Sequence, residues 1–350
     1  MSDYLDTLAK YSYEQLVLFA DPESGLRGAI AIHDTTLGPA LGGCRMWAHP
    51  TEEAGINDVL RLARAMSYKN AAAGLNLGGG KAIILGDPSK DKSEKLFRAL
   101  ARQVDYLGGR YVTTEDVGTT EQDMRVIASV TKHITGLPIS EGGSGDPSPA
   151  TGWGVYQAMR ACAKVALGTD DLAGKRVAVM GLGKVGTYTM EHLHRAGARL
   201  YGTDISTARV KEAQQRFGLT PVDAKDFFAQ ECDIFAPCAL GGVLNKDTIP
   251  MLRAPIVCGG ANNQLLNEEE DSRALAQRGI LYGPDYIANA GGVINLSFEI
   301  GRTYDQQEAF ARVARIYDTM SSVIATAKKE KTTTYHAANR LAEARLMGKR

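Results

Sequence analysis

The chain has 350 residues, of which 44% are hydrophobic and 23% are charged. These proportions are typical of a globular enzyme, and the length predicts about two domains. Lys plus Arg equals Asp plus Glu at 40 each, so no net field attracts nucleic acid or an anionic membrane. The first ten residues lack a signal-peptide pattern and no apolar run approaches ~18 residues, so we expect a cytoplasmic protein.

The cysteines indicate a protein without disulfides. Their number is odd and no C-x-x-C pair occurs, so neither a zinc site nor a disulfide framework is expected and no metal is predicted. We interpret them as reduced, mostly buried thiols: Cys44, Cys162, Cys232, Cys238 and Cys258.

In the first half of the chain, short apolar runs alternate with amphipathic stretches. The runs predict strands at 29–33, 82–85 and 110–113, and the amphipathic stretches predict helices at 52–68 and 93–107. The segment SEGGSGDPSP is crowded with residues that break regular structure, so it predicts a connection between domains.

In the second half, the alternation is more regular. Strands are expected at 176–180, 199–203, 233–236, 256–258 and 280–282, and helices at 185–195, 207–217 and 268–278. Such alternation predicts a parallel sheet with crossover helices. From Phe310 to the end the sequence is helical by period. We therefore expect an α/β protein with two α/β domains around a cleft, the second a Rossmann-type doubly wound parallel sheet.

The sequence RVAVMGLGKVG carries a glycine motif for dinucleotide binding. Gly181, Gly183 and Gly186 form G-x-G-x-x-G between a predicted strand and a predicted helix, where they allow a tight turn, approach of the pyrophosphate and close helix packing. Asp204 ends the next strand and is suited to the ribose hydroxyls. Its charge favours NAD over NADP, although Arg209, one turn further on, keeps NADP open.

Two lysines stand in apolar, small-residue surroundings in the first half. Lys69 lies in MSYKNAAAG, and Lys81 follows three glycines that let the backbone come close to a ligand. A partly desolvated lysine has a lowered pKa and can act as a base, and a second lysine can bind a carboxylate. Asp116 in TTEDVGTT could share the proton. Taken alone, these residues could equally be surface lysines and a helix-capping aspartate.

Seven segments together resemble the glutamate, leucine, phenylalanine and valine dehydrogenase family, and within it the leucine dehydrogenases. They span the chain from about Leu5 to about Leu346 in the family's order, and they read IHDTTLGPALGGCRMW, YKNAAAGLNLGGGKAII, TTEDVGTT, GDPSPATGWGVY, CDIFAPCALGG, GGANNQL and PDYIANAGGVIN.

This resemblance implies roles for individual residues. Lys69 would bind the substrate α-carboxylate, Lys81 would be the general base that activates the amine and the attacking water, and Asp116 would relay protons. Asn289 would face both substrate and cofactor. The remaining implied cofactor positions are Thr151, Gly181, Gly183, Lys184, Val185, Gly186, Asp204, Ile205, Ala239, Asn262 and Asn263.

The resemblance also implies the side-chain pocket. It would be lined by Leu41, Gly42, Gly43, Thr114, Asn289, Val293 and Leu296. Thr114 stands where alanine is usual and Leu296 where valine is usual, which leaves the preferred amino acid open. Lys184 replaces a usual asparagine in the phosphate loop.

The function implied is reversible, NAD-dependent oxidative deamination of leucine, isoleucine or valine to the 2-oxo acid and ammonia. Residues 1–140 would form the substrate, catalytic and oligomerisation domain, with a C-terminal helix at about 325–350 packing on it. Residues 141–324 would form the NAD-binding domain of a homo-oligomer. Two alternatives remain: an aromatic-preferring dehydrogenase of the same family, and a catalytically silent dinucleotide-binding regulator.

Overall fold

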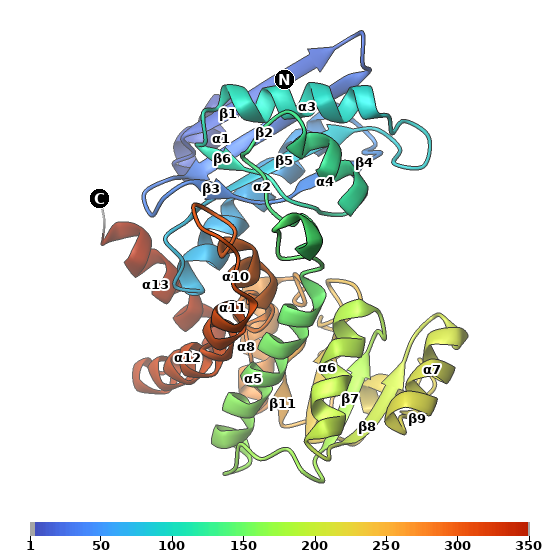
Figure 1. Cartoon of the computed structure of the whole chain (residues 1–350). Coiled ribbons are helices and arrows are strands. Elements are labelled where there is room, and N and C mark those ends of the chain that lie inside the picture. Colours follow the sequence, from blue (N-terminus) through green and yellow to red (C-terminus); the bar gives the residue numbers. More distant parts are fainter. Residues whose placement is uncertain (1–3, 349–350) are drawn as a thin grey trace. The chain divides into compact units, whose positions relative to one another are not determined.

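The computed structural model describes residues 4–348, so the first three residues of the polar N-terminal segment and the last two of the predicted C-terminal helix lie outside the described residues. The chain divides into two compact units (Figure 1). The first comprises Met1–Asp146, Leu296–Tyr304 and Ala342–Arg350, and the second comprises Pro147–Asn295 and Asp305–Leu341. That residues 1–140 and 141–324 form separate domains, with a terminal helix packing on the first, stays a prediction.

The first unit is a mixed α/β structure. Within the described residues its sheet has the order β1-β2-β5-β3-β6, with β4 also paired to β5. The pairs β1–β2 and β2–β5 are antiparallel, and the others are parallel. Its elements are α1 (Tyr4–Tyr11), β1 (Gln15–Asp21), β2 (Leu26–Asp34), β3 (Ala40–Leu41), β4 (Cys44–Trp47), α2 (Glu52–Ala72), β5 (Gly78–Leu85), α3 (Glu94–Tyr106), β6 (Tyr111–Val112), α4 (Glu121–Ala128) and η1 (Ile139–Glu141).

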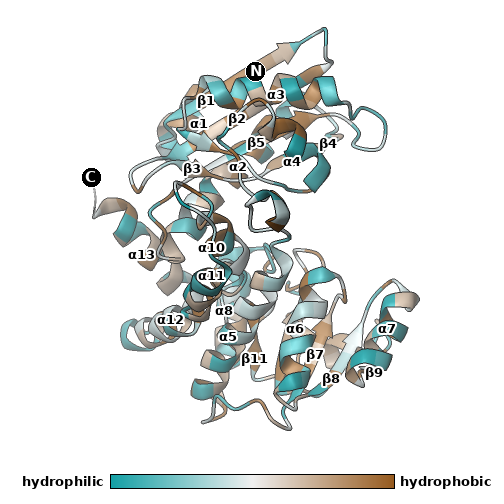
Figure 2. Cartoon of the chain, in the orientation of Figure 1, coloured by the Kyte–Doolittle hydropathy of each residue, from teal (hydrophilic) through white to brown (hydrophobic). Residues whose placement is uncertain are grey.

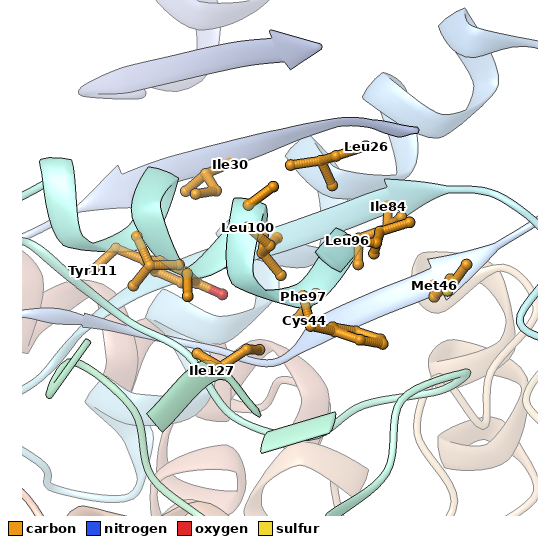
Figure 3. Close-up of a cluster of buried hydrophobic side chains, with 14 of the residues drawn as sticks. Leu26, Ile30, Cys44, Met46, Ile84, Leu96, Phe97, Leu100, Tyr111 and Ile127 are labelled. Atoms are coloured by element: carbon orange, nitrogen blue, oxygen red, sulfur yellow. The ribbon is translucent and has the colours of Figure 1, made fainter. Parts of the chain in front are cut away.

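The two faces of this sheet carry different hydrophobic clusters, because successive side chains of a strand point to opposite faces. On β5, Ala82 and Ile84 join the side chains of α3 and α4, as Figure 3 shows for Ile84. Ile83 instead joins side chains of α2. Lys81 lies two residues before Ile83, so its side chain belongs to the face covered by α2.

The second unit is built around a parallel sheet. Within the described residues the order is β12-β11-β10-β7-β8-β9 and every pair is parallel. Its elements are α5 (Ser148–Ala166), β7 (Arg176–Met180), α6 (Lys184–Arg195), β8 (Arg199–Thr203), α7 (Thr207–Phe217), β9 (Thr220–Pro221), η2 (Phe227–Ala229), β10 (Ile234–Pro237), η3 (Ile249–Met251), β11 (Ile256–Val257), α8 (Glu268–Gln277), β12 (Leu281–Tyr282), α9 (Asp285–Ala288), α10 (Gly291–Ser297), α11 (Gln306–Ala314), α12 (Ile316–Glu330) and α13 (Thr334–Met347); α10 and α13 each continue into the first unit.

This strand order confirms the predicted fold class. The first strand of this sheet, β7, lies in its middle. Strands β8 and β9 are added on one side of β7, and then β10, β11 and β12 are added on the other side. That is the doubly wound order of a dinucleotide-binding sheet, and it places the topological switch point between β7 and β10.

Local sequence pattern predicted several helices and strands with their limits and missed others. Strands β7 and β8 and helix α7 have the predicted limits. Figure 2 shows that α7 consists mostly of hydrophilic residues. Strand β1 and helix α5 were not predicted, and α5 begins at Ser148 inside the expected connection.

Among residues 4–348, no helix has the length and apolar character needed to cross a membrane.

Candidate active site

The three glycines before Lys81 let neighbouring protein segments pack closely on β5. A Cβ on Gly79 would lie 2.0 Å from the Ser67 backbone nitrogen in α2, and one on Gly78 would lie 1.9 Å from the Asp34 carbonyl oxygen. A Cβ on Gly80 would press on the Tyr111 ring. Protein atoms already fill the space that side chains would need at these positions, so the close packing requires glycine, and the approach of a ligand to this backbone stays a prediction.

The same close packing brings the end of α2 onto β5 near both lysines. Asn70, the residue after Lys69, donates from its Nδ2 atom to the Gly78 carbonyl oxygen at 2.6 Å. Lys69 lies in the last turn of α2, and Lys81 lies three residues after Gly78 on β5. The predicted carboxylate-binding lysine and the predicted base thus stand on two elements that are directly bonded to each other.

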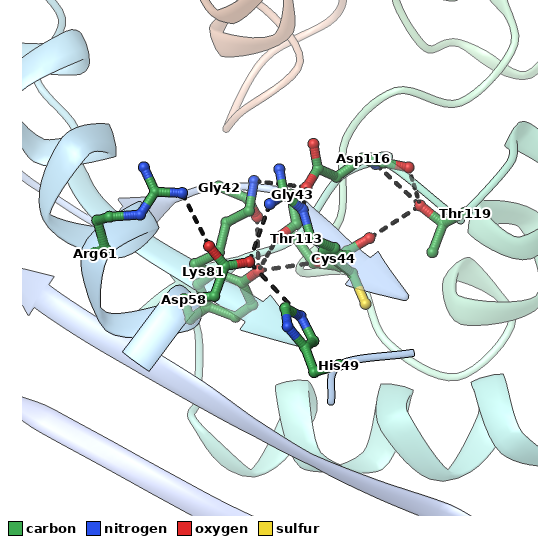
Figure 4. Close-up of polar contacts among 12 residues, drawn as sticks. Gly42, Gly43, Cys44, His49, Asp58, Arg61, Lys81, Thr113, Asp116 and Thr119 are labelled. Carbon is green, nitrogen blue, oxygen red and sulfur yellow. Dashed lines mark hydrogen bonds and ion pairs between the residues drawn. The ribbon is translucent and has the colours of Figure 1, made fainter. Parts of the chain in front are cut away.

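Lys81 and Asp116 form a buried ion pair (Figure 4). Lys81 Nζ lies 3.0 Å from Asp116 Oδ2, and the two side chains are 7% and 20% exposed. Asp116 follows β6, and its backbone nitrogen donates to Thr119 Oγ1 at 2.9 Å. An amine and a carboxylate in such contact, shielded from water, can pass a proton between them.

The Gly42–Gly43 segment runs alongside this pair and leaves no space for side chains. A Cβ on Gly42 would lie 1.8 Å from the Gly80 carbonyl oxygen, and one on Gly43 would lie 2.7 Å from Asp116 Cβ. The buried Tyr111 hydroxyl donates to the Gly42 carbonyl oxygen at 2.6 Å, and burial raises the pKa of Tyr111 well above its usual value. Tyr111 thereby holds the backbone that lies against Asp116.

A further cation reaches Asp116 that the sequence analysis did not single out. Arg45 on β4 donates from Nε to Asp116 Oδ2 at 3.0 Å and from Nη1 to Asp58 Oδ2 at 3.0 Å. Asp58 lies on α2 and also accepts from Arg61 Nη2 at 2.9 Å. The only signal in the sequence is an arginine inside the short apolar strand CRMW, a position that requires an acidic partner.

These charges determine the state of the Asp116 carboxyl. Burial by itself raises the pKa of Asp116, but the positive charges of Lys81 and Arg45 outweigh burial and hold the pKa below its usual value. Asp116 is therefore a carboxylate across the neutral and alkaline range, able to accept hydrogen bonds and protons.

Two predicted pocket residues of the first unit lie side by side. A Cβ placed on Gly136 would lie 2.8 Å from Thr114 Oγ1 and 3.4 Å from Leu296 Cδ2. Thr114 and Leu296 are 7% exposed, whereas Leu41 on β3 is completely buried. Val293 precedes Leu296 on α10 but belongs to the second unit.

Glu299 fastens the segment that carries Leu296 to the segment that carries Gly136. Its carboxylate accepts from the Gly136 backbone nitrogen at 2.9 Å and from the Ser144 hydroxyl. Burial raises the pKa of Glu299 above its usual value, and these hydrogen bonds only partly oppose that shift. No sequence motif indicates this contact, because it joins residues 155 to 163 positions apart.

In the second unit, the three glycines of the loop after β7 have three different surroundings. Gly181 has a φ of 96° and its missing Cβ would collide with Ala239, so this turn requires glycine. A Cβ on Gly186 would lie 2.2 Å from the Gly181 carbonyl oxygen, which keeps α6 close to β7. A Cβ on Gly183 would meet only Arg209 Nη1, at 3.9 Å, so a phosphate can approach the backbone there.

Asp204 closes this loop at the end of β8. Its Oδ2 accepts from the Leu182 backbone nitrogen at 2.7 Å, its Oδ1 accepts from the Ser206 backbone nitrogen at 2.8 Å, and its side chain is 6% exposed. Arg209 Nη1 lies 3.8 Å from Asp204 Oδ2. The neighbouring Ile205 is fully exposed, and Lys184 at the start of α6 is also exposed. A rigid carboxylate thus stands beside the open backbone at Gly183.

The other predicted cofactor residues come from the loops after β10 and β11, from the end of α9 and from the first turn of α5. Asn289 donates from Nδ2 to Asn262 Oδ1 at 2.8 Å, and Asn263 next to it has a φ of 51°. Thr151 Oγ1 donates to the Pro147 carbonyl oxygen and lies against Gly292.

Several contacts link these loops to the glycine loop. Ala239 follows β10 and packs on Gly181, while Val185 lies where a Cβ of Gly260 would be. Asn289 Oδ1 is buried and finds no hydrogen-bond donor among residues 4–348, so a ligand N–H group suits it. Its position beside the switch point fits a dinucleotide.

The five cysteines lie within the described residues and are free thiols, four of them buried and Cys238 partly exposed. This confirms the interpretation of mostly buried thiols. Cys44 lies one residue before Arg45 on β4.

Comparison with known proteins supplies the family. Residues 13–133 match the Glu/Leu/Phe/Val dehydrogenase dimerisation domain, and residues 142–212 and 203–349 match the Glutamate/Leucine/Phenylalanine/Valine dehydrogenase model. The chain is 53% identical over 344 residues to leucine dehydrogenase of Bacillus cereus, covering 98% of this chain and 93% of that protein.

Two further relatives carry different substrate names. Phenylalanine dehydrogenase of Bacillus thermotolerans is 46% identical over 95% of this chain and 88% of its own length. The crystal structure of L-tryptophan dehydrogenase from Nostoc punctiforme superposes with a TM-score of 0.87 at 42% identity, covering 99% of each chain. On this evidence the chain belongs to the Glu/Leu/Phe/Val dehydrogenase family and is an amino-acid dehydrogenase.

Proposed function

We propose that the protein catalyses the reversible, NAD-dependent oxidative deamination of leucine, isoleucine and valine to the 2-oxo acid and ammonia. The observation that carries this proposal is the buried Lys81–Asp116 pair, with Nζ and Oδ2 at 3.0 Å. The relatives named above act on leucine, phenylalanine and tryptophan, so the class of reaction is shared and the side chain of the substrate is the open question.

Lys81 is the general base of the proposed reaction. In its neutral form it takes a proton from the substrate ammonium group and later from the water that attacks the imine carbon. Asp116 accepts the proton from Lys81 through their short contact and returns it to the departing amine. The 6% exposure of Lys81 and its contact with Asp116 support this role, because they hold the amine away from bulk water and beside a proton acceptor.

Lys69 is the proposed partner of the substrate carboxylate. An ammonium group on the last turn of α2, one residue from the Asn70 contact to β5, offers a fixed positive charge near Lys81. Gly42 and Gly43 are also proposed to contact the substrate, and any such contact would come from their backbone, because protein atoms occupy their Cβ positions.

NAD is the proposed cofactor, and when bound it would supply the hydride acceptor for the oxidation. The open backbone at Gly183 and the start of α6 would hold the pyrophosphate. Asp204 would hold the ribose hydroxyls, together with Ile205, Lys184 and Val185 around the loop. The other proposed cofactor residues, Thr151, Ala239, Asn262, Asn263 and Asn289, would orient the nicotinamide end.

The residues that the family resemblance implies for the substrate side chain are Leu41, Val293 and Leu296, which are apolar, and Thr114, which is polar. Such a pocket distinguishes chain lengths only weakly, by about 1–3 kcal/mol per methylene, so all three branched-chain amino acids are expected as substrates. The match to a dimerisation domain over residues 13–133 supports a homo-oligomer assembled through the first unit.

The test is the initial rate of NAD reduction by the purified protein with each of the twenty L-amino acids at alkaline pH. We expect turnover concentrated on leucine, isoleucine and valine, and loss of at least about 100-fold in Lys81→Ala, the scale of a general base. Turnover on phenylalanine or tryptophan instead would contradict the proposed branched-chain substrates but would agree with the proposed mechanism. Retention of most activity by Lys81→Ala would contradict the assigned base.

A further inference from the structure

We infer that Arg45, held in place by Asp58, is a positioning residue that fixes Asp116 and offsets its negative charge, so that contact with Asp116 does not hold Lys81 permanently in its protonated form. This inference rests on the proposed roles of Lys81 and Asp116. Neither Arg45 nor Asp58 belongs to the residues that the sequence motifs indicate for substrate or cofactor.

The guanidinium group of Arg45 bridges two carboxylates from different elements. Its Nε atom donates to Asp116 Oδ2 and its Nη1 atom donates to Asp58 Oδ2, both at 3.0 Å. The Arg45 side chain is 22% exposed and Asp58 is 14% exposed. Because the donors of a guanidinium lie in one rigid plane, two contacts from one group fix both carboxylates relative to each other.

Asp58 is itself held from two further sides, as Figure 4 shows. Arg61 Nη2 donates to its Oδ1 at 2.9 Å, and His49 Nε2 lies 3.7 Å from its Oδ2. Asp58 stands on α2, the helix that also carries Lys69. A row of alternating charges therefore runs from α2 through Asp58, Arg45 and Asp116 to Lys81.

The charge on Asp116 creates a conflict that Arg45 resolves. A carboxylate in contact with an amine favours the protonated amine, whereas a general base must be neutral to accept a proton. Arg45 and Lys81 bind the same oxygen, Asp116 Oδ2. The permanent positive charge of Arg45 beside that oxygen weakens the attraction between the oxygen and the protonated Lys81 amine. An arginine stays charged at every working pH.

Other titratable groups around Asp116 do not supply this charge. Cys44 on β4 and Tyr111 on β6 are completely buried, and burial raises the pKa of both groups. Both therefore stay neutral at the pH of the reaction. Lys92 and Asp123 are ion-paired with each other. Arg45 contacts Asp116 directly, and its charge does not titrate over the working pH range.

The test compares Arg45→Gln, Arg45→Lys and Asp58→Asn with wild type and with a control, Arg98→Gln, which removes an exposed arginine paired with Glu94 on α3. For each we would measure kcat and KM for leucine with NAD across the neutral to alkaline range. NADH binding by fluorescence and thermal unfolding would report on the fold separately.

We expect Arg45→Gln to lower kcat by about 10- to 100-fold, the cost of misplacing a catalytic group, and to move the ionisation that governs kcat/KM to higher pH. Arg45→Lys keeps the charge but cannot span both carboxylates, so it should restore the pH profile more than kcat. Asp58→Asn should lower kcat with a smaller pH shift. NADH binding should be unchanged in all of them.

An unshifted pH profile in Arg45→Gln, or kinetics equal to Arg98→Gln, would overturn the inference while leaving the proposed function intact. Absence of amino-acid oxidation by wild type itself would overturn the proposed function and with it this inference. If Arg45→Gln does not fold, Arg45→Lys and Asp58→Asn decide the outcome, since full wild-type kinetics in both would overturn the positioning role.

Discussion

At the scale of single residues, the charge balance of the site depends on which side chains contact the same atom. Lys81 and Arg45 both bind Asp116 Oδ2, so the state of one carboxyl depends on two cations from different strands. The pKa of Asp116 stays below its usual value although burial alone raises it. The motif TTEDVGTT indicates the aspartate. It gives no information about the contact with Arg45, because the two residues are 71 positions apart in the sequence.

Thr114 is the residue that should control the choice among aliphatic substrates. Its hydroxyl lies beside Gly136 and Leu296, and replacing it by alanine enlarges the proposed pocket and removes its polar group. We expect Thr114→Ala to raise the ratio of kcat/KM for leucine over valine, by about five- to tenfold on the scale of one methylene. Steady-state kinetics with both substrates would measure this ratio.

A matched control is Thr131→Ala, since Thr131 is equally buried in the first unit but bonds Asp105 instead. An unchanged leucine-to-valine ratio in Thr114→Ala would show that this side chain does not line the pocket.

At the scale of elements, strand β5 and helix α2 form the scaffold of the proposed catalytic residues. The glycines of β5 face α2 on one side and β6 on the other, and Asn70 bonds the helix to the strand. The periodicity of apolar residues predicted both elements but started β5 four residues late. Glycines carry no hydrophobic signal, although they pair in the sheet like any other residue.

Gly79 should tolerate no side chain. An alanine Cβ would lie 2.0 Å from the Ser67 backbone nitrogen, which forces α2 away from β5 and separates Lys69 from Lys81. We expect Gly79→Ala to lower the free energy of unfolding by about 3 kcal/mol or more and to abolish most activity. Chemical denaturation would measure the change.

Gly86→Ala provides the comparison, because its Cβ would meet only the flexible ends of Asp91 and Met46 at 3.2 Å. We expect that variant to lose about 1 kcal/mol or less. Equal stability of the two variants would contradict the packing argument.

At the scale of the whole molecule, the first unit is assembled from three separate stretches of chain. Glu299 joins the second stretch to the first through Gly136 and Ser144, and Arg345 in the third stretch donates to the Ala71 carbonyl oxygen at 2.7 Å. The unit is therefore completed only after the chain has passed through the second unit. Linear reading of the sequence placed the first domain at residues 1–140 and could not include Leu296–Tyr304.

The Glu299 contact should make stability depend on pH. The folded-state pKa of Glu299 is raised by burial above its ordinary value of 4.5, so folding favours the protonated form. The contribution of this pKa shift to the free energy of unfolding is fully present below pH 4.5 and is lost as pH rises through the folded-state pKa of Glu299. We expect the stability of wild type relative to Glu299→Gln to fall across this range, measured as thermal unfolding at several pH values.

Glu94→Gln, at an exposed i,i+4 ion pair on α3, should show no such trend. Parallel curves for wild type and Glu299→Gln would mean that the Glu299 carboxyl titrates alike in the folded and unfolded chain.

The sequence by itself determined the features that are local. The glycine loop, the strand before it, the helix after it and Asp204 lie within one continuous stretch, and the motifs around Lys69, Lys81 and Asp116 identify the family. Their physical basis is short-range: turn conformation, hydrophobic period and helix capping act between residues close in the chain.

Only the tertiary structure decided which residues that are distant in the sequence form ion pairs, hydrogen bonds or packing contacts. It brings Arg45 and Asp58 to Asp116, Glu299 to Gly136, and Ser67 against Gly79. Such contacts depend on how elements pack after the chain has folded, and a buried charge selects its partner by proximity in space. A sequence shows that a buried arginine or glutamate needs a partner, but the packing of strands and helices determines which partner it has.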